Sequence, residues 1–567
     1  MKKEVASILK KSLKSISVSL SESEIENMIE IPPQEEMGDF AFPCFFLSKK
    51  LKRNPNEIAL ELNDNIKSKS FERTTVVGGY INFFLDKNIF TKSKIKKILK
   101  EKEKFGKKNI GKGKRVMIEF SQANTHKAFH VGHIRGTSIG ESLSRIDEFF
   151  GRKVIRANYQ GDTGMHVSKW IWCYEKYHSK EKLRGDESWI ASIYVDAIKK
   201  LAKNEKLQKE VNEINKKLES REDKKLNIIW KKTRKLSLDS LEKIYKELNT
   251  KFDVYYFESE AEQRGKEISK ELVKKKIAII SDDATIMNLE KYNLGIWVLL
   301  RSDGTVLYSA KDLALAEKKF KDFKLDNAFY VIANEQELHM NQLSKSLELM
   351  GKENLSEKIR HISYNIVRLP KGKMSSRTGD NVLYSDFMKE IKNHTMKEIK
   401  NREKKISNAE LENRALKISV AAIKYSMLKQ DPKKVIVFNK EDALNFEGNT
   451  GTYLLYSYAR ASSILKKSKI KNRKNNFKIK GVSNEEFILA KKLSEFPEIV
   501  LNAYNSRNPS EIANYSYQLA QVFNEFYHKT KVIDSENEIF LLKLVDSFRI
   551  VLKSSLNLLG IEIVERM

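Results

Sequence analysis

The sequence has 567 residues, with 106 Lys or Arg against 76 Asp or Glu, so its formal net charge at pH 7 is +30. A chain of this length is expected to form roughly three or four domains, and a hydrophobic content of 40% is sufficient for their cores. Two cysteines, Cys44 and Cys173, exclude a disulfide-rich framework, and no apolar run reaches the roughly 18 residues of a membrane-spanning helix.

The positive charge indicates a polyanionic partner such as a nucleic acid. The alternative is a composition that is lysine-rich throughout, because the lysines do not form one patch. The basic residues 1–10 lack the apolar segment of a signal peptide, so we expect a cytoplasmic protein. The cysteines form no CxxC pair, so we expect no structural zinc and no other metal site.

Residues 1–105 are predicted to form a small α/β domain. Two amphipathic helical segments flank the loop at 32–43, and the apolar segment 79–85 is typical of a strand. The charged, glycine-containing stretch 101–114 is predicted to be a linker.

Residues 112–400 are predicted to form a doubly wound α/β domain, because strand-like and helical segments alternate there. Its first strand is predicted at 116–120 and the following helix at 134–150. A Lys/Glu-rich helical insertion is predicted around 178–290. A coiled coil is the alternative for this stretch, although its apolar repeat is short.

Residues 405–567 are predicted to form a helical domain. The segments 415–425 and 450–460 carry apolar residues at helical spacing, and a Lys/Asn-rich link at 466–480 divides the domain. The chain as a whole is therefore predicted to be a multidomain protein of the α/β plus α class.

A first motif lies between the predicted strand and helix of the α/β domain. His130 and His133 stand at the expected helix start, where unpaired N–H groups and the helix dipole favour a phosphate. Gly132 lacks a Cβ and lets a flat ring approach the backbone. The alternative is that His130 and His133 are two ordinary surface histidines, since the four-residue pattern His-x-Gly-His arises often by chance.

A second motif, Lys373-Met374-Ser375-Ser376-Arg377, follows the strand-like segment 362–369. A mobile loop with Lys and Arg can close over a nucleotide and neutralise the charge that develops on its α-phosphate during adenylyl transfer. A solvated basic loop is the alternative. In this order, the two motifs resemble the two signatures of class I aminoacyl-tRNA synthetases.

The resemblance becomes specific for arginyl-tRNA synthetases and runs nearly from end to end. The similar segments are 38–43, 80–84, 119–135, 158–162, 302–312, 330–339, 445–451, 458–460 and 559–567. This resemblance implies a Rossmann-like class I catalytic domain, an N-terminal domain that binds the tRNA elbow, and a C-terminal helical anticodon-binding domain.

The resemblance also implies an activity. It is the ATP-dependent activation of L-arginine to arginyl-adenylate and its transfer to the 3′ end of tRNA(Arg), with adenylate formation dependent on bound tRNA. The substrate is ATP with Mg²⁺, the partners are L-arginine and tRNA(Arg), and a monomer is expected. The implied catalytic and ATP-binding residues are Lys127, His130, Gly132, His133, Lys373, Met374, Ser375, Ser376 and Arg377.

Arginine recognition requires carboxylates, because a guanidinium presents five donors in a planar fork. Glu119 and Asp312 are expected at or just beyond the ends of strands, where open α/β sheets bind ligands. An ordinary strand aromatic is the alternative for Tyr308, and a helix N-cap is the alternative for Asp312. The resemblance implies the following arginine-binding residues: Glu119, Asn124, Tyr308, Asp312 and Gln336.

The tRNA-binding candidates are aromatic and polar side chains of the helical domain that could stack on or contact unstacked bases. They are Tyr453, Tyr456, Tyr458, Arg460, Asn524, Tyr527 and Met567. Packing between helices is the alternative for each aromatic residue.

Three departures from the family pattern concern the site. Ser376 replaces the second lysine of the loop, and either Lys127 or Arg377 could supply the missing cation. Thr163–His166 replaces a segment that usually begins with Trp, and proline is absent at two positions of the first motif. The competing hypotheses are another class I synthetase, such as the cysteinyl or glutamyl type, and a tRNA-binding paralogue without catalysis.

Overall fold

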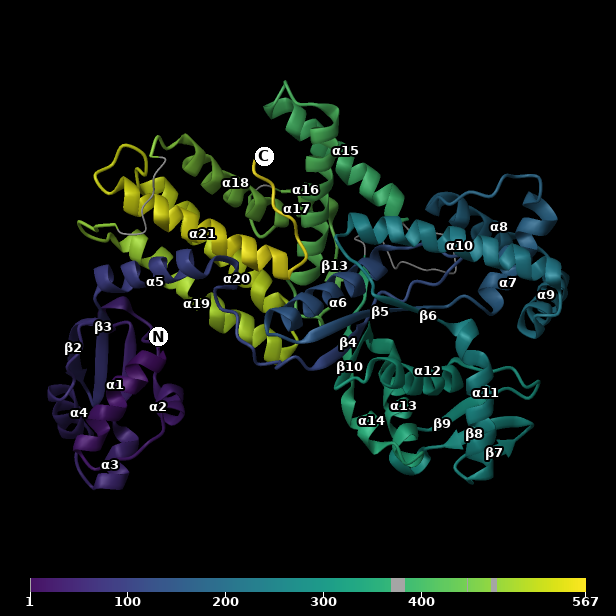
Figure 1. Ribbon diagram of the computed structural model, residues 1–567, viewed down its shortest axis with the longest axis horizontal. Helices are drawn as coiled ribbons and strands as arrows, with labels where there is room; N and C mark the ends of the chain where they lie inside the picture. Colours follow the sequence, from purple (N-terminus) through teal and green to yellow (C-terminus); the bar gives the residue numbers. More distant parts are fainter. Residues whose placement is uncertain (1, 369–382, 446, 471–476) are drawn as a thin grey trace. The chain divides into compact units, whose positions relative to one another are not determined.

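The computed structural model describes residues 2–368, 383–445, 447–470 and 477–567 (Figure 1). It contains two compact units. One is formed by residues 1–102, 467–494 and 522–548, and the other by residues 103–466, 495–521 and 549–567. The predicted second motif at 373–377 lies outside the described residues.

The first unit contains a three-stranded antiparallel sheet in the order β1-β3-β2. The strand predicted at 79–85 is confirmed as β3. Parts of the C-terminal helices belong to this unit as well: Lys491 of α19 places its Nζ 2.7 Å from Oδ1 of Asp39. The elements are β1 (Phe40–Pro43), β2 (Phe71–Val77), β3 (Tyr80–Leu85), α1 (Lys2–Ser15), α2 (Glu22–Met28), α3 (Phe45–Leu51), α4 (Pro55–Asp64), α5 (Lys87–Glu101) and α19 (Asn484–Ser506).

The second unit is built on a five-stranded sheet in the order β11-β10-β4-β5-β6, in which every neighbouring pair is parallel. The chain order reverses between β4 and β10, and open sheets of this kind bind ligands in the crevice at that point. This sheet confirms the predicted doubly wound fold. Its strands are β4 (Arg115–Glu119), β5 (Lys153–Gln160), β6 (Val254–Phe257), β10 (Asn327–Ala333) and β11 (Ile359–Tyr364).

Helix α6 (Val131–Phe149) follows β4, as predicted, and connects it to β5. The helix packs closely on the residue that follows β4. A Cβ built on Gly140 would lie 2.1 Å from Cγ of Phe120, so this position has room only for glycine. The close packing fixes the start of α6 relative to the crevice.

Four helices lie between β5 and β6 and pack together, and a small antiparallel sheet in the order β7-β8-β9 follows α11 (Figure 1). The stretch predicted as one helical insertion, 178–290, therefore contains two inserted parts separated by β6, a strand of the central sheet. The elements are α7 (Met165–Cys173), α8 (Glu187–Lys203), α9 (Gln208–Ser220), α10 (Lys224–Glu247), α11 (Glu258–Lys274), β7 (Ile279–Ser281), β8 (Ala284–Asn288) and β9 (Ile296–Leu300).

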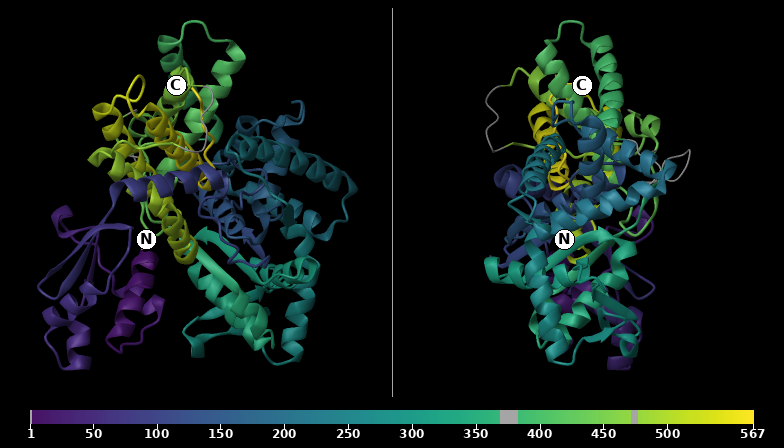
Figure 2. Two further views of the ribbon diagram at one scale, coloured as in Figure 1. Left: turned by 60° about the vertical axis from the view of Figure 1, so that its left-hand side comes forward. Right: turned by 90° about the vertical axis from the view of Figure 1, so that its right-hand side faces the viewer.

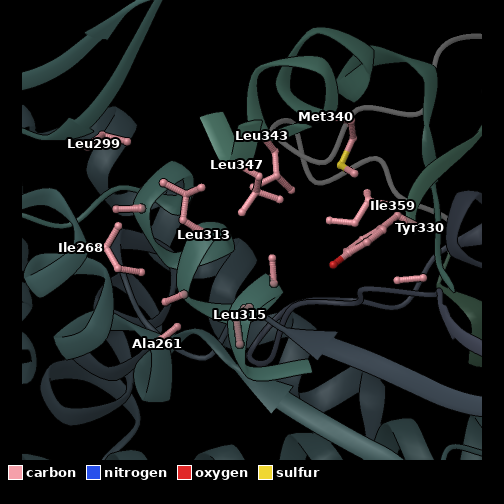
Figure 3. Close-up of a cluster of buried hydrophobic side chains, with 14 of the residues drawn as sticks. Ala261, Ile268, Leu299, Leu313, Leu315, Tyr330, Met340, Leu343, Leu347 and Ile359 are labelled. Atoms are coloured by element: carbon pink, nitrogen blue, oxygen red, sulfur yellow. The ribbon is translucent and has the colours of Figure 1, made fainter. Parts of the chain in front are cut away.

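A hydrophobic cluster joins the inserted part after β6 to the central sheet (Figure 3). Leu313 and Leu315 of α12 (Tyr308–Phe323) pack with Leu343 and Leu347 of α13 (Glu337–Leu349) and with Tyr330 of β10. Burying such side chains contributes about 1.5–3 kcal/mol each. The cluster thereby holds α12 beside the end of the crevice.

The remaining described elements are mainly helical, and the helices predicted at 415–425 and 450–460 are confirmed as parts of α16 and α18. Helices α15 and α16 run side by side as a hairpin (Figure 2). None of the helices in the described ranges is long and apolar enough to cross a membrane. The elements are α14 (Glu353–Lys358), β12 (Val367–Arg368), α15 (Tyr384–Arg402), α16 (Asn408–Leu428), β13 (Ile436–Val437), α17 (Lys440–Leu444), α18 (Gly451–Lys467), α20 (Ser510–Lys529) and α21 (Glu538–Leu558).

Candidate active site

The loop between β4 and α6 has an unusual backbone. Ser121, Gln122 and His126 have φ values of +81°, +39° and +61°, in a region that side chains other than glycine rarely adopt. Side chains hold the loop in this conformation: the hydroxyl of Ser121 donates to Oη of Tyr245 at 3.0 Å and accepts from Oγ1 of Thr137 at 2.9 Å. Such strain persists where the surrounding structure enforces it, which is common at functional sites.

The two histidines of the first motif lie against one another at the start of α6. Their ring centroids are 3.9 Å apart, and the backbone N–H of His130 donates to Nδ1 of His133 at 3.2 Å. Because Nδ1 is the acceptor, Nε2 of a neutral His133 carries the proton and can donate to a ligand. A Cβ on Gly132 would lie 3.0 Å from Cε1 of His130, so glycine lets this ring fold back over the helix start.

Both imidazoles are neutral at pH 7. Burial and the nearby Lys127 lower the pKa of His130 to about 4. Burial, His130 and Lys127 lower the pKa of His133 well below its ordinary value. The positive charge at this helix start therefore comes from Lys127, whose Nζ lies 5.4 Å from the ring centroid of Tyr194 on α8.

Glu119 ends β4, as predicted, and its side chain is buried with 2% exposure. Its Oε2 lies 2.5 Å from Nζ of Lys319, and the same ammonium lies 4.6 Å from the ring centroid of Tyr330. Burial raises the pKa of the Glu119 carboxyl, and Lys319 opposes that shift. Any second cation at Glu119 would therefore share this carboxylate with Lys319.

Asp312 lies on α12 and not at a strand end. It is the fifth residue of a helix that begins at Tyr308, and Leu307 occupies the N-cap position. The strand-end prediction and the N-cap alternative for Asp312 are therefore wrong, as is the strand alternative for Tyr308. The reason is that Ala310, Leu313 and Ala314 lie at helical spacing and are buried in the same hydrophobic cluster, so the helix already includes the turn before Leu313.

His339 holds the carboxylate of Asp312. Nε2 of His339 is 2.7 Å from Oδ2 of Asp312, and the indole N–H of Trp297 donates to Nδ1 of His339 at 3.3 Å. Because Nδ1 accepts, Nε2 of His339 carries the proton that is donated to Asp312. Asp312 also contributes to the raised pKa of Glu119, so the two carboxylates lie within electrostatic range of each other.

The other arginine-binding candidates lie on the loop after β4, at the start of α12 and directly after β10. The side chain of Asn124 packs on Gly161, where a Cβ would be 2.2 Å from Oδ1 of Asn124. The half-exposed ring of Tyr308 lies 4.7 Å from that of His339. Gln336 is exposed in the short 3-10 helix Asn334–Gln336, directly after β10.

Family models match three parts of the chain. Residues 94–439 match a model described as "tRNA synthetases class I (R), catalytic domain", residues 454–567 match "DALR anticodon binding domain", and residues 3–85 match "Arginyl tRNA synthetase N terminal domain". This chain is 37% identical to the arginine–tRNA ligase of Clostridium acetobutylicum and 38% identical to that of Clostridium perfringens. Each comparison covers 97% of this chain and 98% of the relative.

The chain belongs to the arginyl-tRNA synthetase family. The solved arginyl-tRNA synthetase of Thermus thermophilus has the same fold, with a TM-score of 0.79, 26% identity and 100% coverage of both chains. The resemblance stated from the motifs is thus confirmed, together with the class I fold.

Two buried side chains of the synthetase position the first motif, although the sequence alone assigned neither a role. Glu187 of α8 accepts from the backbone N–H of Phe129 at 3.0 Å and from that of Ser385 at 2.8 Å. It therefore ties the first motif to the chain just beyond residues 369–382. The guanidinium of Arg135 donates to four backbone carbonyl groups, those of residues 365, 366, 431 and 432.

Lys319 and His339 were also missed, and each has a local signal in the sequence. Lys319 follows Asp312 by seven residues, which places both on the same face of α12. His339 lies in a segment that resembles the family, three residues after Gln336. The spacing alone does not reveal that Lys319 pairs with Glu119, or that His339 pairs with Asp312.

The tRNA-binding candidates on α18 do not share one environment. Tyr458 is 1% exposed, and its hydroxyl is 3.4 Å from Oε1 of Glu565, so it packs inside the helical bundle and cannot stack on a base. Tyr456 and Arg460 are partly exposed, and the guanidinium of Arg460 lies 4.6 Å from the ring centroid of Tyr456. Tyr453 is partly buried and lies against Tyr517.

The other three candidates lie on later segments. Tyr527 is 37% exposed on α20, whereas Asn524 on the same helix is 7% exposed. Met567 is partly exposed at the end of the chain. Of these side chains, Tyr527 is the aromatic ring that a base could reach.

Below pH 6.5, we expect the synthetase to lose stability through His126. Burial, with smaller effects of His166 and Arg234, lowers the pKa of His126 to about 3, and its ring nitrogens pair with Thr125 and Thr233. In the unfolded chain the pKa is about 6.5, so as the pH falls below this value only the unfolded state binds the proton.

This one group should reduce the free energy of unfolding by about 1.4 kcal/mol per pH unit as the pH falls from about 6.5 toward 3. Urea unfolding of the wild type and of His126→Gln at several pH values measures the effect. The stability advantage of the wild type should shrink as the pH falls, and parallel pH profiles would contradict the assignment.

Proposed function

We propose that the chain is an arginine–tRNA ligase that activates L-arginine with MgATP and transfers it to the 3′ end of tRNA(Arg). The observation that carries the proposal is that Glu119, which ends β4, and the histidine pair at the start of α6 lie on one connected segment, with Asp312 within electrostatic range of Glu119. A neutral histidine pair at the start of α6 suits a phosphate chain, and two carboxylates, Glu119 and Asp312, suit a guanidinium.

In the first step, the carboxylate of arginine attacks the α-phosphorus of ATP, and the bond to the leaving pyrophosphate breaks. Nε2–H of His133 and the ring of His130 contact the phosphates, while Gly132 leaves room for the adenine ring. Lys127 stabilises the negative charge that develops on the α-phosphate. Lys373, with Met374, Ser375, Ser376 and Arg377, binds the nucleotide, and Lys373 neutralises the leaving pyrophosphate.

Arginine is oriented by both of its ends. Asp312, held by His339, accepts N–H groups of the guanidinium, and Glu119 adds negative charge from the end of β4. Asn124, Tyr308 and Gln336 contact the rest of the amino acid. In the second step, a hydroxyl of the terminal adenosine of tRNA attacks the activated carbonyl and AMP leaves. No covalent enzyme intermediate is required, so positioning and electrostatics supply the rate.

Adenylate formation requires bound tRNA in this proposal. Residues 1–105 contact the tRNA elbow, residues 112–400 carry the reaction, and residues 405–567 bind the anticodon loop. Tyr456, Arg460 and Tyr527 are the candidates to contact unstacked bases. The enzyme acts as a monomer in the cytoplasm, where tRNA is charged for translation.

A panel of amino acids in tRNA-dependent pyrophosphate exchange tests the proposed function. Arginine, and not cysteine or glutamate, should stimulate exchange, and it should do so only when tRNA(Arg) is present. Stimulation by cysteine or glutamate would assign the chain to another specificity. Tight tRNA binding without exchange for any amino acid would favour a tRNA-binding paralogue.

A further inference from the structure

A cluster of metal-binding side chains lies in the helical insertion, outside the candidate active site. Sγ of Cys173, a ring nitrogen of His178 and a carboxylate oxygen of Asp196 all lie within 4.8 Å of one another. Sγ is 3.5 Å from Oδ2 of Asp196, and Nε2 of His178 is 3.0 Å from the same oxygen. Cys173 is fully buried, whereas His178 and Asp196 are partly exposed, which leaves a path to solvent.

The backbone explains how Cys173 and His178 come together. Helix α7 ends at Cys173 and continues as a π-helical turn over Tyr174–His178. In a π-helix the hydrogen bonds run from i to i+5, so two residues five apart lie on the same face of the helix. In an α-helix the same two side chains would point in different directions, because the repeat is 3.6 residues. Single π turns of this kind are frequently found at functional sites.

A second set of contacts orients the histidine. Nδ1 of His178 is 2.6 Å from Oε1 of Glu181, and the other oxygen of Glu181 accepts the indole N–H of Trp189 at 2.9 Å. With the Nδ1 proton directed at this carboxylate, Nε2 is the nitrogen that faces Cys173 and Asp196. Histidines that bind metals usually donate their other ring N–H to a carboxylate or carbonyl in this way.

We infer that Cys173, His178 and Asp196 bind one zinc ion that fastens the end of α7 to α8. Thiolate, imidazole and carboxylate are donors that zinc accepts together. With bonds of about 2.0–2.3 Å, tetrahedral ligand atoms are about 3.3–3.7 Å apart. The Sγ–Oδ2 separation of 3.5 Å lies in this range, and the Nε2–Oδ2 separation of 3.0 Å requires a shift of a few tenths of an ångström on binding. The thiolate and the carboxylate together balance the charge of Zn²⁺, and the thiol proton is released to solvent on binding.

The surrounding charges define the competing arrangement. Nζ of Lys200 lies 3.6 Å from Oδ2 of Asp196 and 4.1 Å from the ring centroid of Tyr177. A protonated His178 that bridges Glu181 and Asp196, together with Lys200, would neutralise the acidic groups without a metal. Lys200 is about one-third exposed and can move into solvent when zinc neutralises Asp196.

Metal analysis of the full chain distinguishes these arrangements. The protein is incubated with Zn²⁺, separated from loosely bound metal by gel filtration, and analysed for zinc per chain. About one zinc ion per chain should be retained by the wild type, and most of it should be lost in Cys173→Ser and in Asp196→Asn. The matched control is Cys44→Ser, which removes the other buried thiol of the chain and should retain the metal.

Replacement of zinc by Co²⁺ provides a spectroscopic readout that does not depend on enzyme activity. A sulfur-to-cobalt charge-transfer band in the near ultraviolet should appear in the wild type and in Cys44→Ser, but not in Cys173→Ser. Circular dichroism shows whether each variant is folded, and Asp196→Asn is the second variant should Cys173→Ser fail to fold. A wild type that retains no more zinc than Asp196→Asn and shows no such band would overturn the site.

Discussion

Replacing Lys127 with Ala is expected to slow the formation of arginyl-adenylate by about 10²- to 10³-fold, with little effect on the KM for arginine. The reaction concentrates negative charge on the α-phosphate, and Ser376 stands where the loop motif usually supplies a second lysine. Lys127 contributes to the lowered pKa of both motif histidines, so its positive charge acts at the start of α6.

Single-turnover measurement of adenylate in the presence of tRNA checks this expectation. Lys127→Arg should recover part of the rate, because the charge is kept. Lys231→Ala is the matched control, since it removes an exposed lysine of α10, and its rate should equal that of the wild type. A normal rate for Lys127→Ala combined with a slow rate for Arg377→Ala would assign the missing cation to Arg377.

Asp312→Asn is expected to raise the KM for arginine roughly 100-fold, which corresponds to about 3 kcal/mol of lost charge-assisted hydrogen bonding. The KM for ATP should change little. The amide oxygen of Asn can still accept from Nε2 of His339, so the local structure should be retained. Discrimination between arginine and its neutral analogue citrulline should fall as well, because the negative charge opposite the guanidinium is lost.

Steady-state exchange with arginine and citrulline measures both effects. Asp322→Asn is the matched control: it lies on the same helix, and its carboxylate pairs with Nζ of Lys318 at 2.8 Å on the surface. This control should leave the KM for arginine and the KM for ATP unchanged. A lower kcat for Asp312→Asn with an unchanged KM for arginine would show that Asp312 acts on the reaction and not on substrate binding.

Short-range patterns were sufficient for much of the fold. The apolar run at 116–120 and the helical spacing at 134–150 predicted β4 and α6, because each pattern depends on residues that are neighbours in the chain. The same patterns were insufficient at β6. This strand has only four residues, and its neighbours in the sequence are helical, so it was included in a predicted insertion.

Short-range patterns likewise predicted some residues of the candidate site but not the environment of others. The positions of Glu119 and of the histidine pair followed from the strand and helix that carry them. The environment of Asp312 did not, since its partner His339 lies on another helix and the cluster of Figure 3 brings the two together. Tyr458 fits a stretch that resembles the family, yet its burial could not be read from an amphipathic helix of this length.

The sequence by itself determined the family, the doubly wound catalytic sheet and the motif at the start of α6, because motif spacing and periodicity are properties of contiguous residues. Only the tertiary structure decided that Lys319 lies against Glu119, that Nε2 of His339 lies against Asp312, and that Asp196 meets Cys173 and His178. Ion pairs, tautomers and ligand clusters depend on burial and on contacts between distant segments, and those arise when the helices and the sheet pack.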